Sequence, residues 1–317
     1  ALACTKSNTL LWARMMNPVI SKEGVSLMLL SQLPRSPHDW AKALCSVPCW
    51  QLTPEALLPA ASAHDGAWLV MFGKALDARH LAQVARLLAD HEVEASLYPL
   101  GEQAGVPLLL LGANRFSPEL VQAIKGQEWD IDVCHLAILP TLGEPGLLVM
   151  DMDSTAIRIE CIDEIARLAG VGDQVAAVTA AAMQGKLEFA DSLRSRVALL
   201  EGAPVTILDE VAAAMPWMPG LQLMVDTLKQ SGWTVAIASG GFTRFAGELQ
   251  QALGLDAIFA NELAVEGGLL TGKVSGRIVD AAVKAEVLQQ LARQHEIPVA
   301  QTVAVGDGAN DLKMMGV

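Results

Sequence analysis

The clearest pattern of apolar and polar positions lies between residues 66 and 140. An apolar run at 68–72 is followed by apolar residues at helical spacing over 76–91. Ser117-Pro118 is typical of a helix start, because serine caps the first turn and proline is favoured at the first helical position. The pattern predicts strand, helix, strand, strand, helix and strand, with approximate bounds 68–72, 76–91, 93–97, 107–111, 117–124 and 131–139.

The first 65 residues carry no comparable pattern. Six prolines are scattered there among short apolar runs, at positions 18, 34, 37, 48, 54 and 59. Proline cannot donate a backbone hydrogen bond inside a helix or a sheet. We therefore predict an irregular N-terminal segment over residues 1–65, with no more than one strand.

A different pattern follows the proline and glycine residues of 140–146, which mark the best candidate for a domain boundary. Short apolar strands then alternate with helical patterns, at 147–150, 233–238 and 302–305. Such alternation is typical of an α/β domain with a parallel sheet. The helical pattern over about 163–215 is too long for one crossover, so we predict a helical cap inserted into a domain over residues 141–317.

Length and composition fit this division. At roughly 100–200 residues per domain, 317 residues suffice for about two domains. The mean hydropathy of +0.36 is high, yet no apolar stretch approaches the ~20 residues that a membrane-spanning helix needs, so we expect no membrane segment. With 22 basic and 35 acidic residues the net charge is −13, which argues against a nucleic-acid partner.

The five cysteines favour a reducing compartment. Their number is odd, and their spacing is unlike that of small disulfide-rich domains. Cys45 and Cys49 would supply half of a zinc site, but no second pair or histidine cluster completes it, so ordinary buried thiols are the favoured interpretation. The N-terminal residues contain no continuous apolar stretch before a cleavage site, and we expect a cytoplasmic protein.

Polar residues follow the predicted strands of the second domain. They are Asp151 and Asp153, then Ser239, Gly240 and Gly241, and finally Asp307, Asn310 and Asp311, with Lys284 on a helix that begins near residue 280. Ligands of open parallel sheets bind beside the carboxyl ends of the strands, so these residues are expected to converge. Each motif alone is more often a solvated loop, a helix cap or a turn, whereas together they indicate one site.

The residue types in this set favour phosphate chemistry. Carboxylates at one edge repel each other unless a divalent cation lies among them, and Mg²⁺ prefers carboxylate and phosphate oxygens. Asp151 and Asp307 are the candidate side-chain ligands. With Mg²⁺, Lys284 and glycine-rich backbone N–H groups, such a pocket suits a transferring phosphoryl group. A phosphate ester is therefore the expected class of substrate.

The motifs at the strand ends resemble those of the haloacid-dehalogenase (HAD) superfamily. The matching residues are Asp-Met-Asp-Ser-Thr at 151–155, Ser-Gly-Gly-Phe at 239–242, Lys284, and Gly-Asp-Gly-Ala-Asn-Asp at 306–311. Cap segments at 160–166, 183–189 and 192–197 resemble the phosphoserine phosphatases of that superfamily. The resemblance covers about residues 146–315. It implies a Rossmannoid parallel sheet with a helical cap, and a Mg²⁺-dependent hydrolysis of O-phospho-L-serine to serine and phosphate, the last step of serine biosynthesis.

The resemblance also implies a role for each motif residue. Asp151 would attack phosphorus to form an aspartyl-phosphate, and Asp153 would protonate the seryl oxygen and later deprotonate the attacking water. Mg²⁺ would be held by Asp151, Asp307 and the backbone carbonyl of Asp153. The remaining residues would contact phosphate (Ser239, Gly240, Lys284 and Asn310) or orient Lys284 or the waters of the metal (Asp311).

Substrate choice requires groups that recognise an amino acid. Glu160 suits the ammonium of phosphoserine and Arg196 suits a bidentate pairing with its carboxylate, and both match the cap of the phosphoserine phosphatases. Phe189 and Met183 would form apolar walls. From the residues alone, a solvated helix arginine and a charge at a helix N-terminus are the simpler interpretations of Arg196 and Glu160.

The element order over 66–140 is the split βαβ of ferredoxin-like domains, an α+β fold, and it resembles the ACT family of amino-acid-sensing domains. A structural or dimerising module without a ligand stays an open alternative. The expected partners of the whole chain are a small-molecule substrate and at most a second copy in a homodimer.

Two other functions stay open. One is a catalytically impaired, amino-acid-binding regulatory protein, and the other is a HAD phosphatase for another small phosphomonoester. Intact motifs favour an enzyme. Members of the superfamily continue beyond the Asn-Asp motif with another strand and a terminal helix, so the resemblance implies that the C-terminal part of the α/β domain is truncated here.

Overall fold

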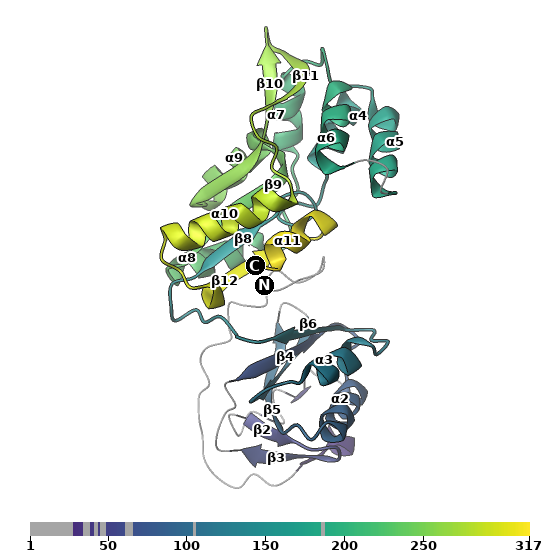
Figure 1. Cartoon of the computed structure of the whole chain (residues 1–317), viewed down its shortest axis with the longest axis vertical. Coiled ribbons are helices and arrows are strands. Elements are labelled where there is room, and N and C mark those ends of the chain that lie inside the picture. The colour runs from purple at the N-terminus through teal and green to yellow at the C-terminus, as the bar shows by residue number, and fades with distance from the viewer. Residues whose placement is uncertain are drawn as a thin grey trace. The chain divides into compact units, whose positions relative to one another are not determined.

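The computed structural model describes residues 28–33, 39–40, 44, 49–60, 66–103, 106–184 and 188–317 (Figure 1). The chain divides into two compact units, one with the described residues up to Leu139 and one with Pro140–Val317, and each is described by itself. Within the described ranges, no helix has both the length and the apolar character needed to cross a membrane.

The first unit is built on an antiparallel sheet whose described strands follow the order β1-β3-β2-β5-β6-β4-β7. Its elements after residue 66 are β4 (Ala67–Phe72), α2 (Ala78–Asp90), β5 (Ala95–Gln103), β6 (Val106–Ala113), α3 (Pro118–Lys125) and β7 (Asp132–Leu136). These are the six elements that the apolar pattern predicts, in the predicted order. The neighbours β5-β6-β4-β7 have the strand arrangement of the split βαβ unit.

Helices α2 and α3 pack on one face of this sheet (Figure 1). Each begins with a side-chain cap, since Asp77 accepts a hydrogen bond from the Arg79 N–H and Ser117 accepts one from the Leu120 N–H. Leu81 of α2 and Leu120 of α3 are fully buried in the core between helices and sheet.

The prediction of irregular structure with no more than one strand before residue 66 was wrong for the described residues 28–29, 49–52 and 56–60. Three short strands are present there, β1 (Met28–Leu29), β2 (Cys49–Leu52) and β3 (Ala56–Ala60), and β2 pairs with β5 to extend the sheet. Trp50 and Leu57 are fully buried. Strands of two to five residues are too short for the periodicity of apolar positions to reveal them. Residues 1–27, 34–38, 41–43, 45–48 and 61–65, which include Cys4 and Cys45, lie outside the described residues.

The second unit contains a five-stranded sheet in the order β11-β10-β9-β8-β12. Strands β8 (Leu147–Met150), β9 (Thr234–Phe242), β10 (Ala257–Glu266) and β12 (Thr302–Val305) are parallel, and β11 (Leu269–Ser275) pairs antiparallel with β10. The parallel sheet is as predicted, but the hairpin β10–β11 was not. Its residues are mostly half-buried or exposed, and its apolar stretch, residues 257–260, is short and followed by alternating polar residues.

Apolar residues cover both faces of this sheet, as is usual for parallel strands. Leu148 and Met150 of β8 face one core, and Leu147 and Val149 face another. The helices that pack there are α8 (Leu221–Gln230), α9 (Thr243–Leu253), α10 (Ala281–Gln294) and the short α11 (Leu312–Met315).

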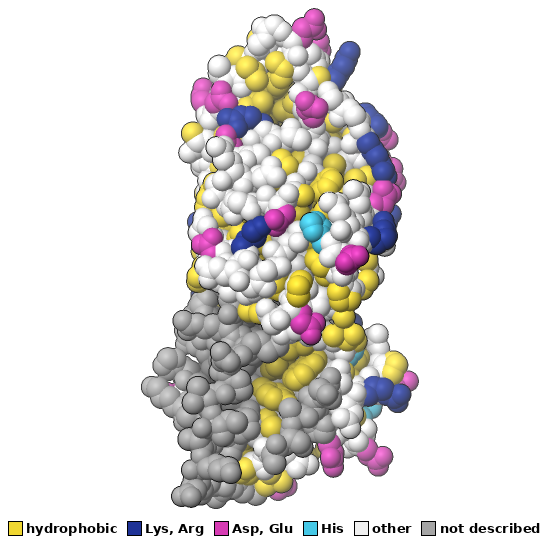
Figure 2. Space-filling view, turned by 90° about the vertical axis from the view of Figure 1, so that its left-hand side faces the viewer, with side chains coloured by type: hydrophobic (Ala, Val, Ile, Leu, Met, Phe, Trp, Pro, Cys, Tyr) yellow, Lys and Arg dark blue, Asp and Glu magenta, His cyan; other side chains and the backbone are white. Residues whose placement is uncertain are grey.

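The predicted cap is present between β8 and α8. It consists of α4 (Cys161–Leu168), α5 (Gly172–Met183), α6 (Phe189–Ala198) and α7 (Thr206–Ala213), close to the expected range of 163–215. On the face shown in Figure 2, the described basic side chains lie among acidic ones and do not gather into a patch.

Candidate active site

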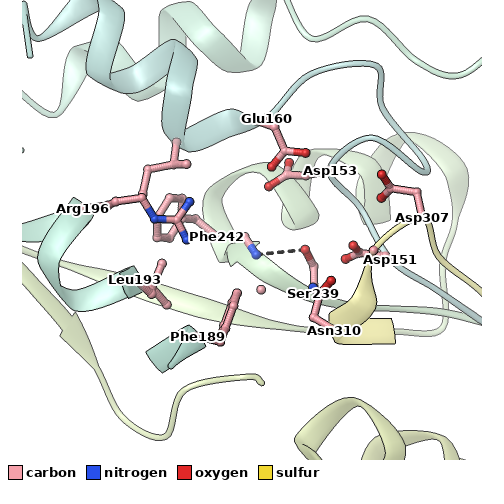
Figure 3. A pocket seen from close by; sticks show the side chains of 14 residues that line it. Asp151, Asp153, Glu160, Phe189, Leu193, Arg196, Ser239, Phe242, Asp307 and Asn310 are labelled. Carbon is pink, nitrogen blue, oxygen red and sulfur yellow. Dashed lines mark hydrogen bonds between the residues drawn. The ribbon is translucent and has the colours of Figure 1, made fainter. Parts of the chain in front are cut away.

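The strand-end motifs meet in one pocket of about 140 Å³ between the sheet and the cap (Figure 3). Asp151 directly follows β8, Ser239 lies near the end of β9, and Asp307 follows β12. The lining residues are Asp151, Asp153, Glu160, Ile162, Phe189, Leu193, Arg196, Ser239, Gly240, Gly241, Phe242, Asp307, Gly308 and Asn310.

Asp151 is almost fully buried, with 5% of its surface exposed, and is paired with a buried lysine. Lys284 Nζ of α10 lies 2.9 Å from Asp151 Oδ1 and 2.8 Å from Asp311 Oδ1. Burial alone would lower the pKa of Lys284, but the two carboxylates outweigh it and raise the pKa above its usual value. Burial raises the pKa of Asp151, and the Lys284 ammonium opposes this shift. Lys284 therefore stands behind Asp151 as a fixed positive charge and does not itself line the pocket.

Three carboxylates form a cluster that could hold a cation. Oxygens of Asp151, Asp307 and Asp311 all lie within 4.8 Å of one another. Thr155 Oγ1 donates a hydrogen bond to Asp307 Oδ1 at 3.3 Å, and the Gly308 N–H donates one to Asp311 Oδ2 at 3.0 Å. One lysine cannot neutralise three carboxylates, so the cluster has the negative excess and the oxygen ligands that a hard divalent cation prefers.

Asp153, two residues further along, has a very different environment. Its Oδ1 atom is buried and has no hydrogen-bond partner among the described residues. A Cβ atom at Gly241 would lie 2.7 Å from Asp153 Oδ2, so only glycine fits beside this carboxylate. Burial raises the pKa of Asp153 to about 7, which suits a group that gives and takes a proton at neutral pH.

The last residues of β9 face these carboxylates. The Gly241 N–H donates a hydrogen bond to Ser239 Oγ at 2.9 Å (Figure 3). A Cβ atom at Gly240 would lie 2.6 Å from Phe189 Cζ, so this end of β9 and the cap are in close contact. Asn310, in a 3-10 turn over Ala309–Asp311, lines the same pocket.

The cap contributes two charged side chains, Glu160 and Arg196 (Figure 3). Ser154 Oγ donates a hydrogen bond of 2.6 Å to Glu160 Oε1, and burial raises the pKa of Glu160. Arg196 Nε donates to the backbone oxygen of Ser192 at 3.4 Å, and burial lowers the pKa of Arg196. Among the described residues, no carboxylate lies within 4.0 Å of the Arg196 guanidinium. The charges of Asp163, Glu160 and Asp153 act on Arg196 from a longer distance and oppose the effect of burial, while its N–H groups stay available to a ligand.

The sequence predictions placed the site residues in one region, and the structure brings them together there. Phe189 forms a wall as expected, while the side chain of Met183 lies outside the described part. Asp311, expected only to orient other groups, joins the carboxylate cluster but is fully buried against Lys284. Cys161 was interpreted as packing and is fully buried at the start of α4.

Two residues were missed, Asn261 and Ser154. Asn261 of β10 is 1% exposed; its Nδ2 donates to the Gly240 oxygen at 2.8 Å, and its Oδ1 accepts the Val279 N–H at 2.9 Å. A polar residue directly after the apolar stretch 257–260 was the available signal. Ser154 adopts a left-handed backbone conformation, with φ of 57°, while it bonds to Glu160.

Comparison with known proteins extends these observations. A sequence model of the family "haloacid dehalogenase-like hydrolase" matches residues 148–316. The phosphoserine phosphatase of Vibrio cholerae is 54% identical over 186 residues, which cover 59% of this chain and 57% of that protein. The chain thus spans less than two thirds of this relative.

Two solved structures are similar as well. The unliganded probable phosphoserine phosphatase of Vibrio cholerae has a TM-score of 0.59 and 42% identity, with 79% of this chain and 76% of that one covered. A structure described as a phospho-aspartyl intermediate analogue of phosphoserine phosphatase has a TM-score of 0.51 and 42% identity, with 54% and 82% covered. Because the family's sequence model matches more than half of the residues, this chain belongs to the haloacid dehalogenase-like hydrolases.

Proposed function

We propose that this chain is a Mg²⁺-dependent phosphatase that hydrolyses O-phosphoserine through an aspartyl-phosphate. The observation that carries the proposal is the Arg196 guanidinium, which faces the pocket opposite Asp151 without an ion-pair partner among the described residues. The relatives named above are phosphoserine phosphatases, which supports the same substrate.

Asp151 is the proposed nucleophile. It lies at the pocket floor beside Lys284, whose ammonium stabilises the carboxylate as the anion that attacks phosphorus. Attack forms a bond between a carboxylate oxygen of Asp151 and phosphorus, and the bond from phosphorus to the seryl oxygen breaks. A phospho-aspartyl analogue described for a similar structure is consistent with this route.

Asp153 is the proposed acid and base. With a pKa near 7 it is partly protonated at neutral pH and can give its proton to the departing seryl oxygen. The carboxylate that this leaves then takes a proton from the water that hydrolyses the aspartyl-phosphate. One group thus serves both half-reactions, and Asp153 is protonated again at the end.

The carboxylate cluster fits Mg²⁺, and we assign Asp151, Asp307 and the backbone carbonyl of Asp153 as its ligands. When bound, the cation supplies positive charge that reduces the repulsion between the Asp151 carboxylate and the phosphate. Asp311 holds Lys284 in place through a hydrogen bond from Lys284 Nζ.

The two ends of the substrate are held by different parts of the unit. We assign the phosphate oxygens to the Ser239 hydroxyl, the Gly240 N–H and Asn310, with Lys284 as the neutralising charge. We assign the substrate ammonium to Glu160 and its carboxylate to a bidentate pairing with Arg196.

Two matched substrates and two matched variants test this proposal. O-Phosphoethanolamine lacks only the carboxylate of O-phosphoserine, so we expect the native chain to prefer phosphoserine in the presence of Mg²⁺. Arg196→Ala is expected to lower kcat/KM for phosphoserine by roughly 10- to 100-fold, as for the loss of a hydrogen bond between charged groups, and to leave phosphoethanolamine unchanged. Arg194→Ala is the control, because Arg194 is exposed on the same helix and pairs with Asp191.

Two outcomes of this test would contradict the proposal. Equal losses with both substrates would exclude Arg196 as the carboxylate-binding residue. A preference of the native chain for phosphoethanolamine would favour another small phosphomonoester, which is the principal alternative.

We also propose that residues 66–140 form an ACT-like module ahead of a catalytic domain over 141–317. The strand order β5-β6-β4-β7 supports this interpretation of the first unit. If the module senses an amino acid, serine should change its melting temperature or hydrogen exchange at concentrations that leave the catalytic site unchanged.

A further inference from the structure

The hairpin β10–β11 joins the cap to the sheet that carries the catalytic residues (Figure 1). The Gly202 N–H donates to the Leu270 oxygen at 2.8 Å, the Leu270 N–H donates to the Ala203 oxygen at 2.8 Å, and the Val205 N–H donates to the Gly268 oxygen at 2.9 Å. The segment 202–205 therefore pairs with β11 almost as an added strand, although it belongs to the cap.

Side chains strengthen this link. Leu270 of β11 is 2% exposed and belongs to the same apolar core as Leu193 and Val197 of α6. Because three backbone hydrogen bonds and a buried leucine act together, α6 is held to the hairpin along its C-terminal end.

Gly272 is the point of closest approach. A Cβ atom there would lie 3.0 Å from Glu201 Cβ and 3.2 Å from the backbone oxygen of Ala198, the last residue of α6. The φ angle of Gly272 is +71°, in the left-handed region that favours glycine. A side chain at this position would have to push the end of α6 away from β11.

The position of α6 determines where Arg196 points. Arg196 lies two residues before Ala198, and the only hydrogen bond of its guanidinium to a described residue is the long one to the Ser192 oxygen. No ion pair within the described part of the chain fixes the side chain, so its aim depends on the backbone of α6.

The same hairpin also holds the other end of the site. Asn261 lies in β10, and its side chain bonds to the Gly240 oxygen near the end of β9, which faces the proposed phosphate position. We propose that the hairpin β10–β11 sets the spacing between this end of β9 and Arg196, and that Gly272 is a specificity-determining positioning residue. This inference rests on the proposed function, because the spacing is assumed to match the distance between the phosphate and the carboxylate of O-phosphoserine.

Gly272→Ala tests the inference, with Gly276→Ala as a matched control. Gly276 has almost the same φ angle, +73°, but a Cβ atom there would meet nothing within 4 Å, so it carries the backbone strain without the contact. For Gly272→Ala we expect KM for O-phosphoserine to rise roughly tenfold, because a small misplacement weakens the pairing with Arg196. Turnover of p-nitrophenyl phosphate, which has no carboxylate to bind, should match that of the control.

The outcomes separate this inference from the proposed function. An equal loss with both substrates, or an unchanged KM for phosphoserine in Gly272→Ala, would overturn the positioning role. If the native chain does not hydrolyse phosphoserine, the proposed function fails, and hydrogen exchange at the amides of 197–200 decides the positioning role. Faster exchange there in Gly272→Ala than in Gly276→Ala supports it, and equal exchange overturns it.

Discussion

At the scale of single residues, two carboxylates separated by one methionine have been given different chemistry by their neighbours. Asp151 has a lysine ammonium 2.9 Å away, while Asp153 has a buried oxygen without a partner among the described residues. When two nearby acids lie in different environments, one can serve as the nucleophile and the other as the proton donor. The assignment of roles therefore follows from burial and charge, and not from the Asp-x-Asp motif alone.

The pKa of Asp153 predicts a pH dependence of the first half-reaction. A donor with a pKa of about 7 loses its proton as the pH rises past that value, so kcat/KM for O-phosphoserine should fall about tenfold for each further pH unit. Initial rates between pH 6 and about pH 9, fitted for the alkaline limb, measure this directly.

p-Nitrophenyl phosphate is the control for that profile, because nitrophenolate leaves without a proton. Its alkaline limb should be much shallower than that of phosphoserine. The Asp151→Asn variant should hydrolyse neither substrate at any pH, because it lacks the nucleophile. Identical limbs for the two substrates would show that Asp153 does not act as the acid.

At the scale of elements, the end of β9 is held in place by a side chain of its neighbouring strand, β10. Asn261 bridges the Gly240 oxygen and the Val279 N–H, and it is fully buried between them. An amide side chain that satisfies a buried acceptor and a buried donor at once is costly to remove, because both backbone groups are left unpaired.

Asn261→Ala is therefore expected to lower the free energy of unfolding by about 1–3 kcal/mol, and kcat should fall as the end of β9 shifts. Urea denaturation and initial rates on phosphoserine measure the two effects. Asn261→Asp keeps the acceptor for Val279 but loses the donor for Gly240, so it separates the two bonds. An alanine variant with unchanged stability and unchanged kcat would contradict this role.

The length and apolar character of each element explain which parts of the fold could be predicted. Apolar runs such as 147–150 identify a strand that is buried on both faces, and the rule for the carboxyl ends of strands then places Asp151 and Asp307 together. Strands β1 to β3 are too short to show a period, and in β10 and β11 the short apolar stretches pass into polar, half-buried or exposed residues. The role of Asn261 could not be predicted, because its partners are backbone atoms that only the folded chain brings within reach.

At the scale of the whole molecule, charge limits how the site can work. The chain has a net charge of −13, and the pocket itself is lined by four carboxylates against one guanidinium, with Lys284 behind them. A phosphate ester brings further negative charge into this field. Lys284 and Arg196 alone do not balance it, so we expect a bound cation to be needed for the proposed substrate to approach Asp151.

Removal of Mg²⁺ tests that balance in two independent ways. EDTA should reduce the release of phosphate from O-phosphoserine to background, and added Mg²⁺ should restore it.

Because a ligand that binds only the folded state stabilises it, Mg²⁺ should also raise the melting temperature of the native chain without substrate, by the equivalent of about 2.7 kcal/mol at a hundred times its Kd. Asp307→Asn should weaken both responses, since Asp307 belongs to the carboxylate cluster. Full turnover in EDTA would show that Lys284 and Arg196 neutralise the substrate by themselves, and the assignment of the cluster to a cation would then be wrong.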